Sequence, residues 1–227
     1  MRMRVFICVA VLVLAGALSS ALQVQRFDNI VRDDFFAGMS GDTARFDRAM
    51  KTCEEALAEN PKNGPALVWH GAGLLVRSGI AFRGGDRDGG MTLRSRALRE
   101  MDDAVALSPG DVQVLIPRAA ILLASARFAP VEQSREMART AAADYEKVLV
   151  IEAPYASTLG THPRGELLGG LATAYRLDGD DDKARSYLTR ITKELPGTRY
   201  DQKAQKWLAD LQAVPRDEHF CIGCHDK

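Results

Sequence analysis

The residues best suited to chemistry lie at the carboxyl end of this 227-residue chain, where Cys221, Cys224 and His225 form a C-x-x-C-H motif. This motif is the sequence signature of covalent haem attachment. Two thiols at this spacing reach the two vinyl groups of one porphyrin, and the adjoining imidazole lies beneath the iron as an axial ligand. We therefore predict one covalent haem c, with Cys221 and Cys224 forming thioethers and His225 acting as the proximal iron ligand.

Two other uses of these side chains are open. A closed zinc site needs four ligands, whereas the two cysteines with either His219 or His225 supply only three. No second C-x-x-C and no H-x-x-H lies nearby. The other use is a redox-active cysteine pair, but a histidine directly after the second cysteine favours haem.

The second axial ligand of the iron must come from elsewhere, because only two residues follow the motif. His70 and Met101 stand at positions of the helical pattern that predict core packing. His162 is predicted in a loop and is less constrained, while His219 is so close to the motif that folding back over the haem would be strained. A five-coordinate iron or a ligand from a partner is equally compatible with the sequence. The candidates within the chain are His70, His162, His219, Met91, Met101 and Met137.

The amino terminus predicts export. Two arginines precede an apolar stretch over residues 5–18, and small residues follow up to Ala21, as in a secretory signal. Residues 1–24 are therefore interpreted as a signal peptide, or as an uncleaved membrane anchor in which residues 5–24 span the bilayer. Both alternatives place the rest of the chain in the periplasm or another extracytoplasmic space, where haem is attached to C-x-x-C-H, and the second tethers it to the inner membrane.

Charge and cysteine usage narrow the function classes. Thirty basic and thirty acidic residues cancel, and nucleic-acid binding has no electrostatic support. Cys8 lies in the apolar leader and Cys53 stands alone on a helical stretch, which leaves no disulfide framework to hold the fold.

The body of the chain shows a helical repeat pattern. Apolar residues recur at helical spacing from Gly41 to about Leu211, with Pro or Gly between the segments. Four prolines are predicted to end similar helices, at intervals of 48, 45 and 42 residues: Pro61, Pro109, Pro154 and Pro196. The prediction is an all-α fold of stacked helix pairs.

The unit from Leu171 to Pro196 resembles a tetratricopeptide (TPR) repeat. The matching residues are Leu171, Ala172, Tyr175, Gly179, Ala184, Leu188, Ile191 and Pro196. Small residues are expected to let paired helices approach closely, namely Ala49, Gly71, Ala97 and Ala184. The resemblance implies a TPR-like α-solenoid over residues 25–213, which binds protein partners along one face.

The repeat units exceed the usual TPR length of about 34 residues. Insertions are therefore expected in loops over residues 79–91, 127–132 and 157–164, and Pro117 is expected to interrupt the start of a helix. Residues 43–60 are predicted as a leading half-repeat and residues 198–213 as a polar closing helix. Residues 214–227 then form a C-terminal tail, in which a polar hinge over 215–218 leads to Phe220 and the motif.

Together these features predict an exported monohaem c-type cytochrome on a TPR-like scaffold. It would act in electron transfer, or as the haem-bearing subunit of a membrane or periplasmic redox complex, with redox proteins as partners of the array. We expect the haem to be covered by Phe220, by the edge of the array, by an insertion loop or by a partner. Cytochromes c′ also carry C-x-x-C-H near the carboxyl terminus, but the repeated Ala and Pro pattern fits helix pairs better. The alternative is a non-redox periplasmic scaffold whose motif binds a metal or is unmodified; no acid, base or substrate pocket indicates an enzyme.

Overall fold

The structure is a computed structural model that describes residues 26–156, 158–218 and 220. The predicted signal or anchor segment lies outside these residues. So do His219 and the three motif residues, Cys221, Cys224 and His225. Within the described part of the chain, no helix is both long enough and apolar enough to cross a membrane.

The described residues form nine α-helices and one short 3-10 helix and contain no strand, which confirms the all-α prediction. In chain order these are α1 (Asp28–Met39), α2 (Thr43–Glu59), α3 (Gly64–Arg83), α4 (Arg87–Leu107), α5 (Val112–Ala126), α6 (Val131–Glu152), η1 (Ala153–Tyr155), α7 (Thr161–Asp178), α8 (Asp181–Glu194) and α9 (Arg199–Ala209).

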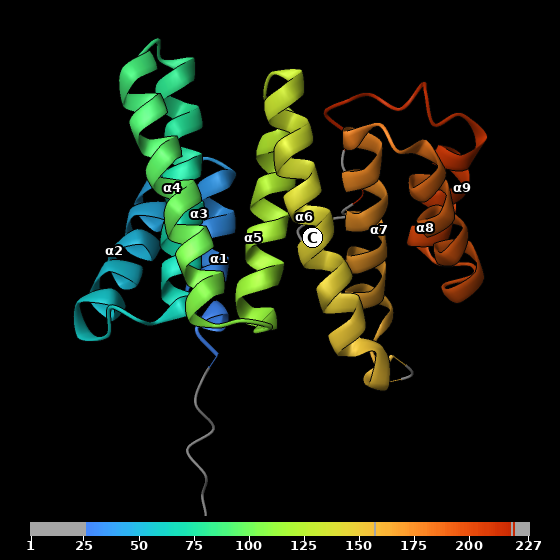
Figure 1. The fold of residues 1–227 in the computed structure, drawn as a ribbon, viewed down its shortest axis with the longest axis horizontal. Coiled ribbons are helices and arrows are strands. Elements are labelled where there is room, and N and C mark those ends of the chain that lie inside the picture. Colours follow the sequence, from blue (N-terminus) through green and yellow to red (C-terminus); the bar gives the residue numbers. More distant parts are fainter. Residues whose placement is uncertain (1–25, 157, 219, 221–227) are drawn as a thin grey trace, which may run out of the picture.

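The helices stand in a row of neighbouring pairs (Figure 1). Helix α1 packs on α2, α3 on α4, α5 on α6 and α7 on α8, and α9 closes the row against α8. Odd-numbered helices also contact one another along the row, from α1 to α3, α5, α7 and α9. These odd-numbered helices thus make a continuous layer, on which the even-numbered helices pack.

Four prolines end helices as predicted. Helices α2, α4, α6 and α8 each end two residues before one of them: Pro61, Pro109, Pro154 and Pro196. A proline has no N–H to continue the helical ladder. The residues before Pro61, Pro109 and Pro196 lie outside the helical region, as a following proline favours, whereas Ala153 before Pro154 keeps helical dihedral angles and begins η1. The four prolines thus mark the points at which α2, α4, α6 and α8 end.

Two of the turns at these prolines are built in the same way. In both, the proline is followed by a glycine with positive φ, Gly110 at 82° and Gly197 at 74°. An N-cap residue comes next, and its side-chain oxygen accepts a hydrogen bond from the first turn of the next helix: Asp111 from the Gln113 N–H and Thr198 from the Asp201 N–H. The chain is thus reversed by the same kind of turn after α4 and after α8.

The prediction of a loop over residues 79–91 is wrong. Helix α3 continues to Arg83 and α4 begins at Arg87, so the additional residues lengthen both helices instead of forming a loop. Gly85, with φ of 84°, makes the turn, and Asp86 caps α4 by accepting a hydrogen bond from the Gly89 N–H. Gly90 is needed inside α4 because a Cβ there would overlap the ring of Phe82.

Other boundaries are corrected in the same way. Residues 127–130 make only a short turn, and Val131 already begins α6. Helix α7 begins at Thr161, within the insertion expected over residues 157–164. Pro117 lies inside α5, and that helix begins at Val112 without interruption.

The array also begins earlier than predicted, because α1 precedes α2 and completes a pair. Val31 and Phe35 of α1 are buried, and the Phe35 ring packs edge-on to Phe46 of α2 at 5.5 Å between centroids. The predicted half-repeat is therefore a full helix pair. The expected role of small residues is visible at Gly71 of α3, where a Cβ would come within 2.9 Å of the Ala97 carbonyl oxygen of α4.

Candidate haem-attachment site: the docked C-terminal segment

The last described residues lie on the helix array. After α9 the chain passes over one end of the row and back toward α7 and α6 (Figure 1). We call residues 214–218 together with Phe220 the docked segment. It contains the residues predicted as a polar hinge, and each contact below fixes part of it to α5, α7 or α9.

Arg176, near the end of α7, holds the backbone of the docked segment. Its guanidinium donates hydrogen bonds to four carbonyl oxygens, those of Val214 at 3.1 Å, Pro215 at 3.2 Å, Glu218 at 3.2 Å and Arg216 at 3.4 Å. It also stacks over the Trp207 ring of α9, 5.0 Å from the ring centroid. Burial lowers the pKa of the Arg176 guanidinium, although nearby acidic groups oppose that shift.

A second attachment joins the segment to the turn between α5 and α6. Arg127 donates to the Asp217 carbonyl oxygen at 2.9 Å, and Arg216 donates to the Ala129 carbonyl oxygen at 2.8 Å. The two bonds run in opposite directions between the same pair of segments. The docked segment therefore bridges α9, α7 and the α5–α6 turn.

Glu218 is held by α9. The Trp207 indole N–H donates to its carboxylate at 3.2 Å, and the Lys203 ammonium lies 3.6 Å away. Burial raises the pKa of Glu218, but the Trp207 hydrogen bond and the charges of Lys203 and Lys206 outweigh it, and the net shift is downward. The carboxylate is thus stabilised in its charged form.

Phe220 inserts its ring into a groove between α7 and α9 and is 2% exposed. The ring packs edge-on to Trp207 at 5.1 Å and stacks on Tyr200 at 6.4 Å between centroids. Glycines on α7 make the groove, because a Cβ on Gly169 would overlap the Phe220 ring and one on Gly165 would overlap the Tyr200 ring. Phe220, which directly precedes Cys221 in the chain, therefore anchors the segment.

A hydrogen-bonded chain of three side chains lies beside this groove. Tyr200 donates its hydroxyl proton to the Glu166 carboxylate at 2.6 Å, and His162 Nδ1 lies 2.7 Å from the same hydroxyl oxygen. His162 is not a loop residue as predicted but the second residue of α7, and its side chain is 52% exposed.

The other described candidates for an iron ligand lie elsewhere. His70 of α3 is buried, with Nδ1 2.5 Å from the Glu100 carboxylate, which confirms its interpretation as a satisfied core histidine. Met101 is fully buried and Met137 is 4% exposed, while Met91 is 46% exposed on α4. Among the residues that the structure describes, no three His, Cys, Asp or Glu side chains are grouped to hold a metal ion.

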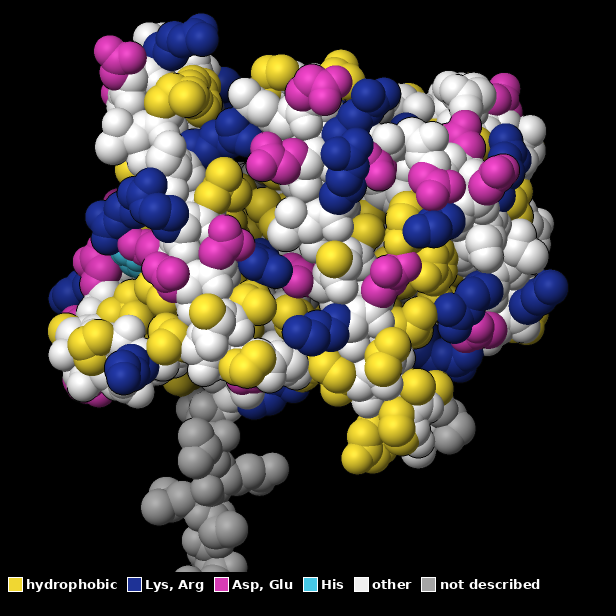
Figure 2. Space-filling model, viewed as in Figure 1, with side chains coloured by type: hydrophobic (Ala, Val, Ile, Leu, Met, Phe, Trp, Pro, Cys, Tyr) yellow, Lys and Arg dark blue, Asp and Glu magenta, His cyan; other side chains and the backbone are white. Residues whose placement is uncertain are grey.

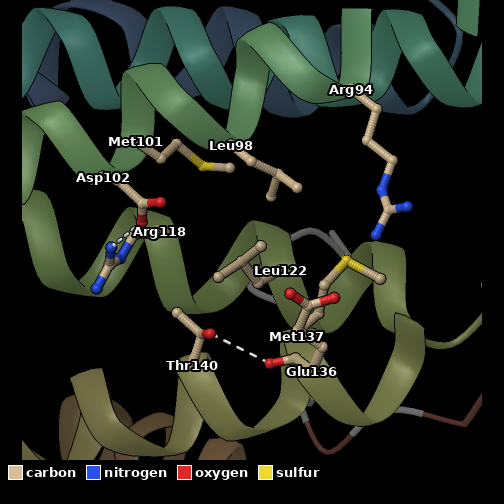
Figure 3. Close-up of a pocket in the computed structure, with 9 residues that line it drawn as sticks. All are labelled: Arg94, Leu98, Met101, Asp102, Arg118, Leu122, Glu136, Met137 and Thr140. Carbon is tan, nitrogen blue, oxygen red and sulfur yellow. Dashed lines mark hydrogen bonds and ion pairs between the residues drawn. The ribbon is translucent and has the colours of Figure 1, made fainter. Parts of the chain in front are cut away.

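One cavity, of about 80 Å³, opens between α4 and the α5–α6 pair (Figure 3). Arg118 of α5 lies at its edge and donates to Asp144 of α6 at 2.6 and 2.7 Å and to Asp102 of α4 at 2.8 Å. These ion pairs join three helices. Burial lowers the pKa of Arg118, but the hydrogen bonds and charges of Asp144 and Asp102 outweigh it, and the net shift is upward. Every polar partner in the pair is satisfied, as structural ion pairs require.

A second cavity, of about 170 Å³, lies between the end of α6, α7 and α8. Arg164, Arg190 and Glu194 line it; Arg164 donates to the Glu194 carboxylate at 2.8 Å, and Arg190 donates to the same carboxylate at 2.9 Å. Small-molecule sites usually have volumes of about 300–1,000 Å³. Both cavities are smaller, so neither has the room to enclose a macrocycle.

The surface carries charges of both signs. On the face shown in Figure 2, Lys and Arg side chains alternate with Asp and Glu side chains over all the helix pairs, in keeping with the balanced composition. Apolar side chains gather around the lower end of α6, where Val150 and Tyr155 are exposed.

No protein-family model matches the chain, and no curated protein and no solved structure is significantly similar to it. The TPR resemblance therefore stays a prediction.

The residues that hold the docked segment were not recognised in the sequence. Arg176 and Trp207 carry no motif, because backbone carbonyls and one aromatic ring are their main partners. A weak signal exists in Gly165, Gly169 and Gly170, since glycines spaced by four inside a helix usually mark a close approach of another group.

Proposed function

We propose that the chain is an exported monohaem c-type cytochrome, in which a TPR-like array fixes the position of a haem-bearing C-terminal segment. Cys221 and Cys224 would form the thioethers, and His225 would be the proximal ligand. The observation that supports this best is the docking of residues 214–218 and Phe220, which brings the chain to the motif from a fixed point between α7 and α9.

The motif residues suit a covalent haem in their chemistry, since two thiols and one imidazole stand at the required spacing. When bound, the haem would supply one-electron transfer. The protein's own part is to hold the attachment point. Arg176 binds backbone carbonyl oxygens before the motif, and the buried Phe220 ring anchors the residue that directly precedes Cys221. A haem held in this way would lie near the surface of α7 and α9, because Phe220, which directly precedes Cys221, packs between these two helices.

The TPR-like arrangement is supported by the packing of neighbouring pairs and by the continuous layer of odd-numbered helices. The prolines after α2, α4, α6 and α8 support it as well. Such arrays present extended binding surfaces. We propose that redox proteins bind this one close to the haem, as soluble partners or as subunits of a membrane or periplasmic complex.

The test is to produce the full chain in a bacterial host with and without a cytochrome c maturation system. With the system we expect haem absorbance that survives denaturation and acid–acetone extraction, and a mass increase of one haem. Changing both Cys221 and Cys224 to Ser should remove all covalent haem, whereas the matched Cys53→Ser variant should keep it, because Cys53 is buried far from the motif in sequence.

A colourless but folded product from the maturation host would contradict the proposal. It would favour the alternative of a non-redox scaffold, and metal analysis of that product would then show whether the motif binds zinc or is unmodified.

A further inference from the structure

We propose that the lower end of α6 together with η1 is a membrane-contact surface, which inserts shallowly into the interface of a lipid bilayer; this inference does not require the predicted haem. We call residues 149–156 the apolar tip. They form the last turn of α6, the whole of η1 and the residue after it. Four features of the apolar tip support a lipid partner: its exposed side chains, its position in the molecule, its hydrogen bonding and its scarcity of charge.

The apolar tip presents large apolar side chains to the outside. Val150 is 74% exposed and Tyr155 is 62% exposed. Pro154, directly before Tyr155, is exposed as well. Glu152 is the only charged residue among residues 149–156. Contiguous exposed apolar groups mark a contact with a protein or with a membrane, and the remaining features decide between these two.

The position of the apolar tip favours a membrane. In Figure 1 the lower end of α6 reaches below the other helices, and the described chain begins at that same end, beneath α1. The residues before this point include 5–24, which are predicted as a signal peptide or an uncleaved anchor. If this segment stays in the membrane, a bilayer lies beside the apolar tip, whereas the chain after α9 crosses the opposite ends of the helices.

The apolar surface extends beyond the tip itself. Ile151 lies against the turn between α4 and α5, since a Cβ on Gly110 would come within 3.9 Å of its Cδ1 atom. Leu107, at the end of α4 before that turn, is exposed. On the other side, residues of the apolar tip line the cavity of about 170 Å³: Leu149, Ala153 and Ala156. Figure 2 shows apolar side chains gathered at this end of α6, so lipid would meet a surface rather than a single side chain.

The backbone of the apolar tip suits a lipid environment because its polar groups are bonded locally. The Ala156 N–H donates to the Ala153 carbonyl oxygen at 3.3 Å, and the Thr158 N–H donates to the Tyr155 carbonyl oxygen at 2.8 Å. The Thr158 hydroxyl donates to the same carbonyl oxygen at 2.8 Å, and Pro154 has no N–H. Unpaired polar groups are costly in hydrocarbon. The apolar tip can therefore enter the interface without leaving these groups unpaired.

Tyr155 is a residue type that membranes favour at this depth. Tyrosine is enriched at the membrane–water interface because its ring is apolar and its hydroxyl is polar. The opposite end of α6 differs: Phe128 is also 74% exposed, but the Arg127 guanidinium lies 5.4 Å from its ring centroid, and Arg216 donates to the neighbouring Ala129 carbonyl oxygen. Phe128 thus matches the apolar tip in exposure but lies among charges.

The experiment places a fluorescent reporter at each end of the molecule. The full-chain variants Tyr155→Trp and Phe128→Trp are mixed with phosphatidylcholine vesicles, with or without bromine on the acyl chains, which quenches tryptophan inside the bilayer. Trp69 and Trp207 are buried, so wild-type emission can be subtracted, and the ratio between the two kinds of vesicle cancels any quenching by haem. We expect a shift to shorter wavelength and quenching for Tyr155→Trp and neither for Phe128→Trp.

A second substitution tests the apolar contact directly. Val150→Asp, added to Tyr155→Trp, should lower the ratio of inserted to free tip at least about tenfold, because burial of one large aliphatic side chain contributes about this factor. The matched control is Val131→Asp, which changes a valine that is 55% exposed at the other end of α6 and should leave the quenching unchanged. Circular dichroism establishes that each variant is folded.

Three outcomes would overturn the proposal. In the first, brominated lipid leaves the emission of Tyr155→Trp unchanged. In the second, both reporters are quenched equally, which indicates adsorption without orientation. In the third, the shift of Tyr155→Trp appears without lipid, grows with protein concentration and disappears with Val150→Asp, which would show that the apolar tip binds a second copy of the chain. These results are independent of whether the motif carries haem.

Discussion

Arg176 joins α7 to the C-terminal segment through backbone carbonyls, which makes its contribution independent of the side chains of residues 214–218. A guanidinium can serve several acceptors because its donors form a rigid planar fork, whereas an ammonium group is a compact charge on a flexible stem. The stacking of Arg176 over Trp207 adds a contact that also requires the planar group.

Arg176→Ala should release the docked segment. Hydrogen bonds from charged groups contribute about 1.5–3 kcal/mol, and we expect the free energy of unfolding to fall by about 2–3 kcal/mol. Trypsin should then cleave after Arg216 at least about tenfold faster, since each 1.4 kcal/mol is a factor of ten in the open fraction. Arg176→Lys should give a similar loss.

The matched control is Arg139→Ala, which removes an exposed arginine of α6 that pairs with Asp178 of α7 at 2.7 Å. It should leave the cleavage rate after Arg216 unchanged. Equal protection of that bond in Arg176→Ala and in the wild type would show that the observed carbonyl contacts do not hold the segment.

At the level of whole helices, α1 shows how charge joins one element to the next. Asp34 of α1 accepts hydrogen bonds from Arg45 at 2.7 Å and Arg48 at 2.6 Å, both on α2. The bonds from Arg48 and Arg45 lower the pKa of Asp34 to about 2, against the opposing effect of burial. Because the folded-state pKa lies below the unfolded value, the stabilisation is complete above about pH 4 and is lost as the pH falls toward 2.

Asp34→Asn should therefore destabilise the protein at pH 7, and the difference from the wild type should shrink as the pH falls from 4 to 2. Pairs of this exposure contribute about 1 kcal/mol or less. Urea unfolding at several pH values measures the difference, with Asp33→Asn as control because Asp33 is 80% exposed and lies 3.8 Å from Arg32. A difference that stays constant over this pH range would rule out the charged pair as its source.

The helices were predictable where the signal is local. Proline after a helix and Asp or Thr before the next one depend only on neighbouring residues, and the structure places helix ends at all four predicted prolines. The region over 79–91 was misread because Gly84, Gly85, Gly89 and Gly90 resemble a loop. Gly90 instead serves tertiary packing against Phe82, a reason that no local pattern contains.

Over the whole molecule, the array and the C-terminal segment are linked by contacts between residues far apart in sequence. Arg127 bonds to Asp217 across 90 positions, and Gly169 makes room for Phe220. Such contacts leave no periodicity in the sequence, which explains why residues 215–218 were predicted as a polar hinge. The C-x-x-C-H motif could be recognised in the sequence because covalent haem attachment requires one fixed spacing of the two cysteines and the histidine.

The proposed function thus depends on a haem that is held in one place on the array. A haem at the end of the docked segment would lie near α7 and α9 and far along the row from α1 and α2 (Figure 1). Electron transfer would then take place at one end of the molecule, and partners would be selected by the helices around it.

Paramagnetic broadening of backbone amide signals in the ferric, haem-loaded protein tests this claim most directly, because unpaired electrons broaden only nearby nuclei. The double variant Cys221→Ser with Cys224→Ser provides the diamagnetic reference. We predict that signals from α7, α9 and the α5–α6 turn broaden while those from α1 and α2 stay sharp. Sharp signals throughout α7 and α9 in protein shown to carry covalent haem would contradict the account.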